Sequence, residues 1–148
     1  MTAGLPVAAR KAAAADYDRA QAAHHAAYRD MIVAAFGVWD EAAQDQYFRE
    51  GWNPDTFEIL LWQDQFCGDT AVEDRGDHLY VDELVIHPDY QNRGIGTAAL
   101  RAIMDRAEQL GVPVRLQTRH VNRARHLYRK VGFREIGQTV THVLFEWP

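Results

Sequence analysis

The sequence predicts an α/β fold, with a mixed, mainly antiparallel sheet of six to seven strands flanked by about four helices. Helical and strand-like segments alternate along the 148 residues, and short polar turns join several of the strands. With 47% hydrophobic residues, a chain of this length buries about two thirds of the surface that its unfolded form exposes. We therefore expect residues 1–148 to form a single domain.

The first segments predict an edge strand and two helices. Residues 5–11 can form a short strand, and alanine-rich residues 14–36 predict a helix that stops at Gly37. Tyr28, Ile32, Ala35 and Phe36 are expected to lie on one side of this helix. A second helix is expected over 40–50, before the loop signal Gly51-Trp52-Asn53-Pro54.

Strand patterns dominate the middle of the chain. Residues 57–62 and 66–73, joined by Gln63-Asp64-Gln65, predict a hairpin, and Gly76-Asp77 turns the chain into an apolar strand over 79–86. A helix follows, because apolar residues recur at helical spacing at Ile95, Ala99, Ile103, Ala107 and Leu110.

The last third predicts a strand, a short helix and a closing hairpin. The strand is expected over 112–116 and the helix over 123–131, with Asn122 as its N-cap and Gly132 just beyond its end. Residues 133–136 and 139–146, separated by Gly137-Gln138, predict the hairpin.

The junction between the strand over 79–86 and the following helix carries the glycine-rich segment Gln91-Asn92-Arg93-Gly94-Ile95-Gly96-Thr97. The first N–H groups of a helix have no intrahelical partner and carry the positive end of the helix dipole, so a phosphate can bind there. A P-loop would need a Gly-Lys-Ser/Thr ending, and a dinucleotide fingerprint would need a third glycine. Neither is present.

The remaining pattern, Gln/Arg-x-x-Gly-x-Gly/Ala, resembles the cofactor signature of the GCN5-related N-acetyltransferases (GNAT family). Before it stands Leu84-Val85-Ile86-His87-Pro88-Asp89-Tyr90, which is similar to the family's fourth strand and the turn that follows it. Further on, Asn122 to Tyr128 and Val131-Gly132-Phe133 resemble the family's second cofactor segment. Two motifs in the right order extend the resemblance from about Leu5 to Trp147.

The resemblance implies acetyl-CoA as cosubstrate, without a metal, and an amine acceptor that is a small molecule or a peptide. It implies direct acetyl transfer within a ternary complex. The cofactor residues that it implies are Leu84, Val85, Ile86, Gln91, Asn92, Arg93, Gly94, Ile95, Gly96, Thr97, Asn122, Arg125 and Tyr128.

Two adjacent acids, Asp82 and Glu83, interrupt the apolar strand and are the candidate general bases. Burying an unpaired charge is costly, so each acid needs either a partner or a wet cleft. Consecutive strand residues point to opposite faces, and Asp82 shares the parity of Leu84 and Ile86, which favours Asp82 slightly. An ion pair or a place at the strand's rim explains either acid equally well.

By resemblance, Tyr128 is the general acid that protonates the leaving thiolate, and a packing tyrosine that only holds the sulfur is the alternative. The oxyanion donor is expected to be a backbone N–H near Ile86, where the family's strand bulges and separates from its neighbour. Gln117 stands where some relatives have a glutamate, which puts their proton path in doubt.

Composition excludes several other classes of function. A net charge of −5 argues against nucleic acid, and no apolar run reaches the length of a membrane span. The seven histidines show no ligand spacing, so no metal is expected, and Cys67 is interpreted as a core thiol. A single cysteine and no secretion signal favour a cytoplasmic protein.

Two readings other than amine acetylation stay open. One is a catalytically silent module that binds or senses acyl-CoA, and the other is thioesterase-like or O-acyl transfer. The acceptor can be a small amine, an amino acid, an aminoglycoside, a peptide N-terminus or a protein lysine, and a homodimer is a possible assembly.

Overall fold

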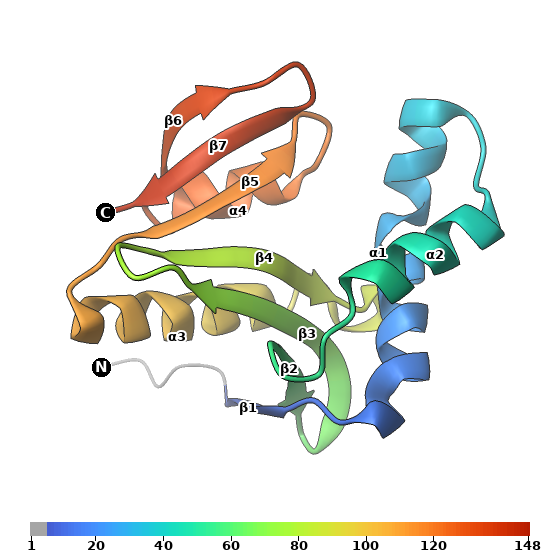
Figure 1. The fold of residues 1–148 in the computed structure, drawn as a ribbon, viewed down its shortest axis with the longest axis horizontal. Coiled ribbons are helices and arrows are strands. Elements are labelled where there is room, and N and C mark those ends of the chain that lie inside the picture. Colours follow the sequence, from blue (N-terminus) through green and yellow to red (C-terminus); the bar gives the residue numbers. More distant parts are fainter. Residues whose placement is uncertain (1–5) are drawn as a thin grey trace.

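The computed structural model describes residues 6–148 and confirms the predicted fold class (Figure 1). Seven strands form one sheet in the order β1-β2-β3-β4-β5-β7-β6, and every neighbouring pair is antiparallel except β4 and β5. Residue 5, at the start of the expected edge strand, lies outside the described residues. The strands are β1 (Val7–Lys11), β2 (Phe57–Trp62), β3 (Gln65–Asp74), β4 (Leu79–Ile86), β5 (Val114–Arg119), β6 (Arg134–Gln138) and β7 (His142–Trp147).

All four predicted helices are present, and local capping sets their ends. They are α1 (Tyr17–Phe36), α2 (Glu41–Gly51), α3 (Ile95–Leu110) and α4 (Ala124–Lys130). Gly37 ends α1 in a left-handed conformation with a φ of 80°. The Asp40 carboxylate accepts the backbone N–H of Ala43 at 3.1 Å at the start of α2, and the Asn122 side chain accepts that of Ala124 at 2.9 Å at the start of α4.

The helices cover both faces of the sheet. On one face, Ile59 of β2 packs with Phe57, and the ring of His24 from α1 lies 6.1 Å from the Phe57 ring. On the other face, the next residue, Leu60, packs with Ile95 of α3. The largest core cluster is also on this second face, between α3, α4 and strands β4, β5 and β7.

The parallel pair β4 and β5 is joined over only a short length. Leu79 to Val81 pair with Val114 to Leu116, and beyond these residues β4 continues along β3 while β5 continues along β7. The two halves of the sheet therefore separate in the middle, on the side toward which β4 runs into the glycine-rich segment (Figure 1).

Two predicted boundaries in the last third were wrong. The fifth strand begins at Val114 instead of residue 112, because the N–H of Val112 bonds to the carbonyl of Ala107 and completes the end of α3. Gly137 does not form the closing turn but pairs with Leu144 inside β6–β7. The turn lies at 139–141, where the Thr139 hydroxyl accepts the backbone N–H of His142 at 2.9 Å.

The apolar side predicted for α1 is buried only in part. Ala20, Ala23 and His24 are buried in its first half, whereas Phe36 at its end is 60% exposed. The last turns of α1 and the start of α2 extend beyond the strands as an arm (Figure 1). Within residues 6–148, no helix has the length and apolar character needed to cross a membrane.

Candidate active site

The glycine-rich segment forms the N-terminus of α3. Gly94 adopts a left-handed conformation with a φ of 83°, which an L-side chain rarely tolerates, and it turns the chain into the helix. The first bond of α3 runs from the N–H of Ala98 to the carbonyl of Gly94, so the N–H groups just before it have no partner within the helix. Buried Ile95 anchors this turn, and the geometry suits an anion.

The predicted cofactor segments on β4, α3 and α4 approach one another at Gly96. A Cβ placed on Gly96 would lie 3.5 Å from Leu127 of α4 and 3.7 Å from Ile86 of β4. The Gln91 side chain donates a hydrogen bond to the Ile86 carbonyl at 2.9 Å and ties the loop to the strand.

The remaining residues of the two cofactor segments differ in exposure. Val85 and Ile95 are buried, whereas Leu84, Thr97 and Arg125 are half-buried. Arg93 is exposed, and its guanidinium lies 5.3 Å from the ring centre of Trp62. Asn92 is exposed, with a φ of 62°. Asn122 was predicted to be the N-cap of α4, but the helix begins one residue later than expected and Arg123 occupies the N-cap position. The Asn122 side chain still accepts the N–H of Ala124 in the turn before the helix.

A β-bulge at Asp82 overturns the parity argument for the two acids. Glu83 pairs with Ala71 and Val81 pairs with Val72, so Asp82 is an extra residue on β4 without a partner on β3. The bulge shifts the alternation of side chains along β4 by one residue. Leu84 therefore packs on the same side of the sheet as Val81, and even spacing from Leu84 no longer shows on which side Asp82 lies. The bulge was also expected near Ile86, which instead pairs regularly with Gly68.

Glu83, and not Asp82, lines a pocket. The pocket has a volume of about 120 Å³, and its walls come from α1, α2, β2 and β4. The Tyr28 hydroxyl donates a hydrogen bond to Glu83 at 3.1 Å. Burial raises the pKa of Glu83 above its usual range, although the charge of His24 and the Tyr28 hydrogen bond oppose the shift. Asp82 is exposed to solvent.

Sequence reasoning missed a buried, hydrogen-bonded pair of titratable residues near Glu83. His24 of α1 and Asp69 of β3 are hydrogen-bonded at 2.7 Å between Nε2 and Oδ1, and Asp69 is fully buried. Asp69 carries the same signal that singled out Asp82 and Glu83, an acid among apolar strand residues. His24 shows no such signal, because only the packing of α1 on β3 reveals its partner.

Tyr128 is buried in the core between α4 and the sheet. Its ring lies 6.0 Å from Phe133 and 5.8 Å from Phe145. Burial and the charge of Glu83 raise the pKa of Tyr128 to about 12. The hydroxyl therefore stays protonated at neutral pH and can donate a proton or a hydrogen bond.

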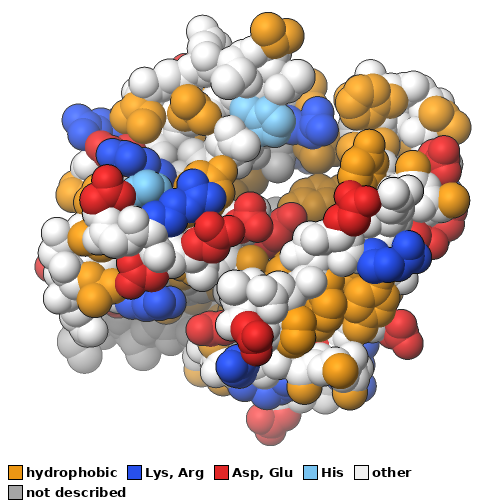
Figure 2. Space-filling view, in the orientation of Figure 1, with side chains coloured by type: hydrophobic (Ala, Val, Ile, Leu, Met, Phe, Trp, Pro, Cys, Tyr) orange, Lys and Arg blue, Asp and Glu red, His pale blue; other side chains and the backbone are white. Residues whose placement is uncertain are grey.

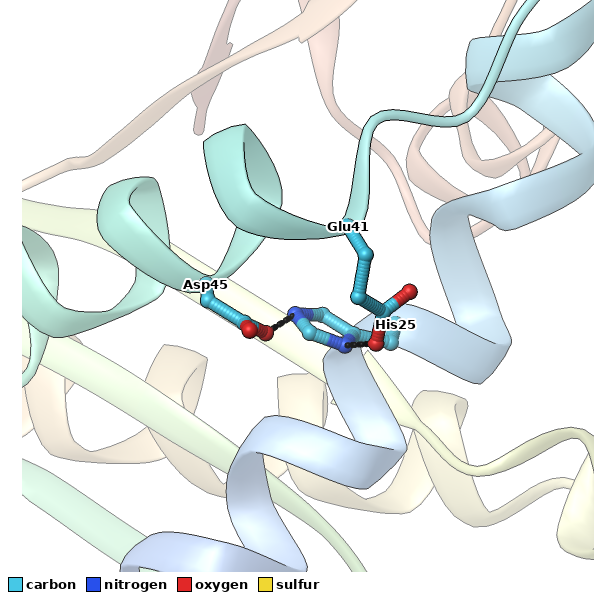
Figure 3. Close-up of side chains that lie close together, drawn as sticks. All are labelled: His25, Glu41 and Asp45. Atoms are coloured by element: carbon cyan, nitrogen blue, oxygen red, sulfur yellow. Dashed lines mark ion pairs between the residues drawn. The ribbon is translucent and has the colours of Figure 1, made fainter.

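The side chains of His25, Glu41 and Asp45 lie close together, and His25 also lines the pocket (Figure 3). The imidazole of His25 lies between two carboxylates of α2, with Nδ1 3.6 Å from Glu41 and Nε2 3.4 Å from Asp45. This group could hold a metal ion, and the sequence does not reveal it because the residues belong to two helices. The two carboxylates approach opposite nitrogens of one ring, which is the geometry of ion pairing. The absence of a metal stays a prediction.

The surface beside this region is hollowed. Figure 2 shows a depression between the α1–α2 side and the strands, with acidic side chains next to it. Aromatic residues line the pocket as well, and Trp39, Phe48 and Phe57 are among them. Cys67 takes no part, since it is fully buried in β3 and burial raises its pKa to about 11.

Solved structures share this fold at low sequence identity. PaiA N-acetyltransferase from Thermoplasma acidophilum, in complex with coenzyme A, is 16% identical and superposes with a TM-score of 0.77 over 95% of this chain and 98% of its own. The ribosomal-protein-S18-alanine N-acetyltransferase from Escherichia coli is 20% identical, with a TM-score of 0.70 over 97% and 94% of the two chains.

A larger enzyme contains the same fold as one part. N-acetylglutamate synthase from Neisseria gonorrhoeae, complexed with coenzyme A and L-arginine, is 18% identical, with a TM-score of 0.63 over 94% of this chain and 32% of its own. At these identities the likeness concerns the fold. A comparison with curated proteins finds no significant match.

The family assignment follows from a sequence model. The model of the acetyltransferase (GNAT) family matches residues 24–133, which include Glu83, the glycine-rich segment and Tyr128. That match covers most of the chain and agrees with the fold and with the coenzyme A complexes of the structural neighbours. The chain therefore belongs to the GNAT acetyltransferase family.

Proposed function

We propose that this protein is an acetyl-CoA-dependent N-acetyltransferase that acetylates a primary amine by direct attack within a ternary complex. The observation that carries the proposal is the position of Glu83. Its carboxylate lines the pocket between α1, α2 and β4, on the strand that leads into the glycine-rich segment. An acceptor in the pocket and a cofactor on the segment would meet along β4.

Glu83 would act as the general base. An alkylammonium has a pKa near 10.4, so its nucleophilic neutral form lies about 4–5 kcal/mol uphill at pH 7. A carboxylate whose own pKa is raised accepts that proton more readily, directly or through water. The neutral nitrogen then attacks the thioester carbonyl carbon, and the carbon–sulfur bond breaks as the amide forms.

Two other groups would complete the reaction. Backbone N–H groups of β4 beyond Val81, where β5 no longer pairs with this strand, are candidates for the oxyanion donor. Tyr128 would protonate the departing thiolate and recover its proton from solvent. The unpaired N–H groups at the start of α3 would hold the diphosphate of the cofactor.

A cationic aliphatic amine is the acceptor class that the pocket supports. Glu83 lines the pocket, and the carboxylates of Glu41 and Asp45 lie beside it around His25, so negative charge gathers at this site.

Labelled acetyl-CoA with a panel of amines tests the proposal. Glu83→Gln should lower kcat/KM by about 10²–10⁴-fold at pH 7 and flatten its pH dependence. Asp82→Asn, a matched neutralisation of the adjacent residue, should change kcat/KM only a few-fold. Equal losses in both variants would contradict the role of Glu83. Cofactor binding without turnover would favour a silent sensing module, and release of free acetate would favour a thioesterase.

A further inference from the structure

The buried pair His24–Asp69 is a polar feature that the proposed chemistry does not use. Asp69 is 0% exposed and His24 is 6% exposed, so both are removed from water. Only one oxygen of Asp69 is hydrogen-bonded, because Oδ2 has no partner among residues 6–148. A buried carboxylate with so few partners is costly unless the partner carries a positive charge.

The surroundings of His24 strengthen its electrostatic interactions. The imidazole is enclosed by aromatic rings, at 4.8 Å from Phe48, 5.9 Å from Tyr28 and 6.1 Å from Phe57. Apolar walls lower the local dielectric, so the charges of nearby groups act on one another more strongly than in water. Both His24 and Glu83 line the same pocket.

The charged and titratable groups facing Glu83 come from four elements. Tyr28 and His24 approach from α1, Asp69 from β3, Asp82 precedes it on β4, and Tyr128 lies on α4. Of these, His24 is the group that can carry a positive charge. Burial lowers the pKa of His24, but the hydrogen bond and charge of Asp69 and the charge of Glu83 outweigh burial, so that its pKa is raised.

We propose that His24 and Asp69 are positioning residues for Glu83: Asp69 holds the imidazolium of His24 beside the Glu83 carboxylate, and this positive charge keeps Glu83 ionised and ready to accept a proton. The inference rests on the proposed amine acetylation. In each turnover the acceptor ammonium gives one proton to Glu83, which becomes a neutral acid and later returns the proton to solvent. The charges of His24 and Asp69 do not change.

Asp69→Asn tests the idea, because the amide preserves shape and a hydrogen bond to His24 but removes the charge that keeps the imidazole protonated. The variant removes two charges near Glu83: the positive charge of His24, which lowers the pKa of Glu83, and the negative charge of Asp69, which raises it. Because the influence of His24 is the larger, the acidic limb of the kcat/KM profile should move to higher pH, by up to about one unit. A change in thermal stability with an unmoved limb would overturn the proposal.

Two controls separate positioning from general destabilisation. Asp16→Asn neutralises another buried acid, which pairs with Arg10 at 2.8 Å. This variant should lower the thermal stability of the protein but leave the acidic limb of the kcat/KM profile at the same pH. In a Glu83→Gln background, Asp69→Asn should cost little further activity, because its effect acts through Glu83. Additive losses in the double variant would contradict the proposal.

A measurement on the unaltered protein is independent of turnover and of variant folding. In ¹⁵N-histidine spectra, His24 should carry protons on both ring nitrogens at pH 7. A neutral His24 at that pH would refute the inference. If the protein acetylates no amine although His24 is protonated, the proposed function fails. If amines are acetylated but Asp69→Asn leaves the acidic limb of the kcat/KM profile in place, only the positioning role fails.

Discussion

Gly68→Ala tests how closely β3 approaches β4 next to the pocket. Gly68 pairs with Ile86 and directly precedes Asp69. A Cβ at this position would lie 2.1 Å from the carbonyl oxygen of Val85 and 3.0 Å from the Cα of Ile86. Both are backbone atoms, so no side-chain rotation can relieve the contact.

The size of the effect follows from these distances. Ordinary contact begins at 3.4 Å, so the strands must move apart by roughly 1.3 Å to admit the methyl group. Overpacking costs about 1–3 kcal/mol even where side chains can adjust. We therefore expect the free energy of unfolding to fall by about 3 kcal/mol or more, which is a large part of the 5–15 kcal/mol that stabilises a typical domain.

Urea unfolding followed by circular dichroism measures the change, and the midpoint should fall while the slope stays constant. Gly51→Ala is a suitable control, because a Cβ on Gly51 meets nothing within 4 Å at the end of α2. The control should be neutral or stabilising by up to about 1 kcal/mol. If Gly68→Ala unfolds at the same urea concentration as the parent protein, the close approach of the strands is incorrect.

Three further outcomes are expected. Gly96→Glu should abolish coenzyme A binding in calorimetry while circular dichroism shows a retained fold, because a carboxylate would occupy the anion site; unchanged affinity would remove the site from consideration. Tyr128→Phe should lower kcat by about 10–100-fold with little change in cofactor affinity, and an equal loss of affinity would make the hydroxyl a binding group only. Cys67 should resist thiol reagents at pH 9 in the native protein and react in urea, since burial raises its pKa to about 11; fast native labelling would contradict this.

Local sequence patterns were sufficient for the helices and most strands, because caps and periodicity are local properties. Asp40 and Gly37 identify helix ends through their own side chain or backbone. The end of α3 was harder to predict, since Val112 is apolar in sequence and yet its N–H completes the helix. Gly137 resembles a turn residue but pairs with Leu144, a partner that only the tertiary fold supplies.

The candidate site was predictable only where its residues are consecutive. The glycine-rich segment is one continuous stretch, and its place between strand and helix follows from the pattern. The preference for Asp82 over Glu83 depended on strict alternation, and one unpaired residue on β4 removes that argument. Tyr28 and His24 contact β4 and β3 from a helix about fifty residues earlier, and no spacing rule connects them.

Different elements form the pocket and the glycine-rich segment, so substitutions can change one without changing the other. The pocket that contains Glu83 draws most of its walls from α1, α2 and the loop between them, whereas the glycine-rich segment forms the N-terminus of α3. If the proposed function holds, substitutions at Trp39, Gln44 or Tyr47 should alter which amine fits without disturbing cofactor binding. A library restricted to these three positions would explore new acceptors while the proposed cofactor site stays the same.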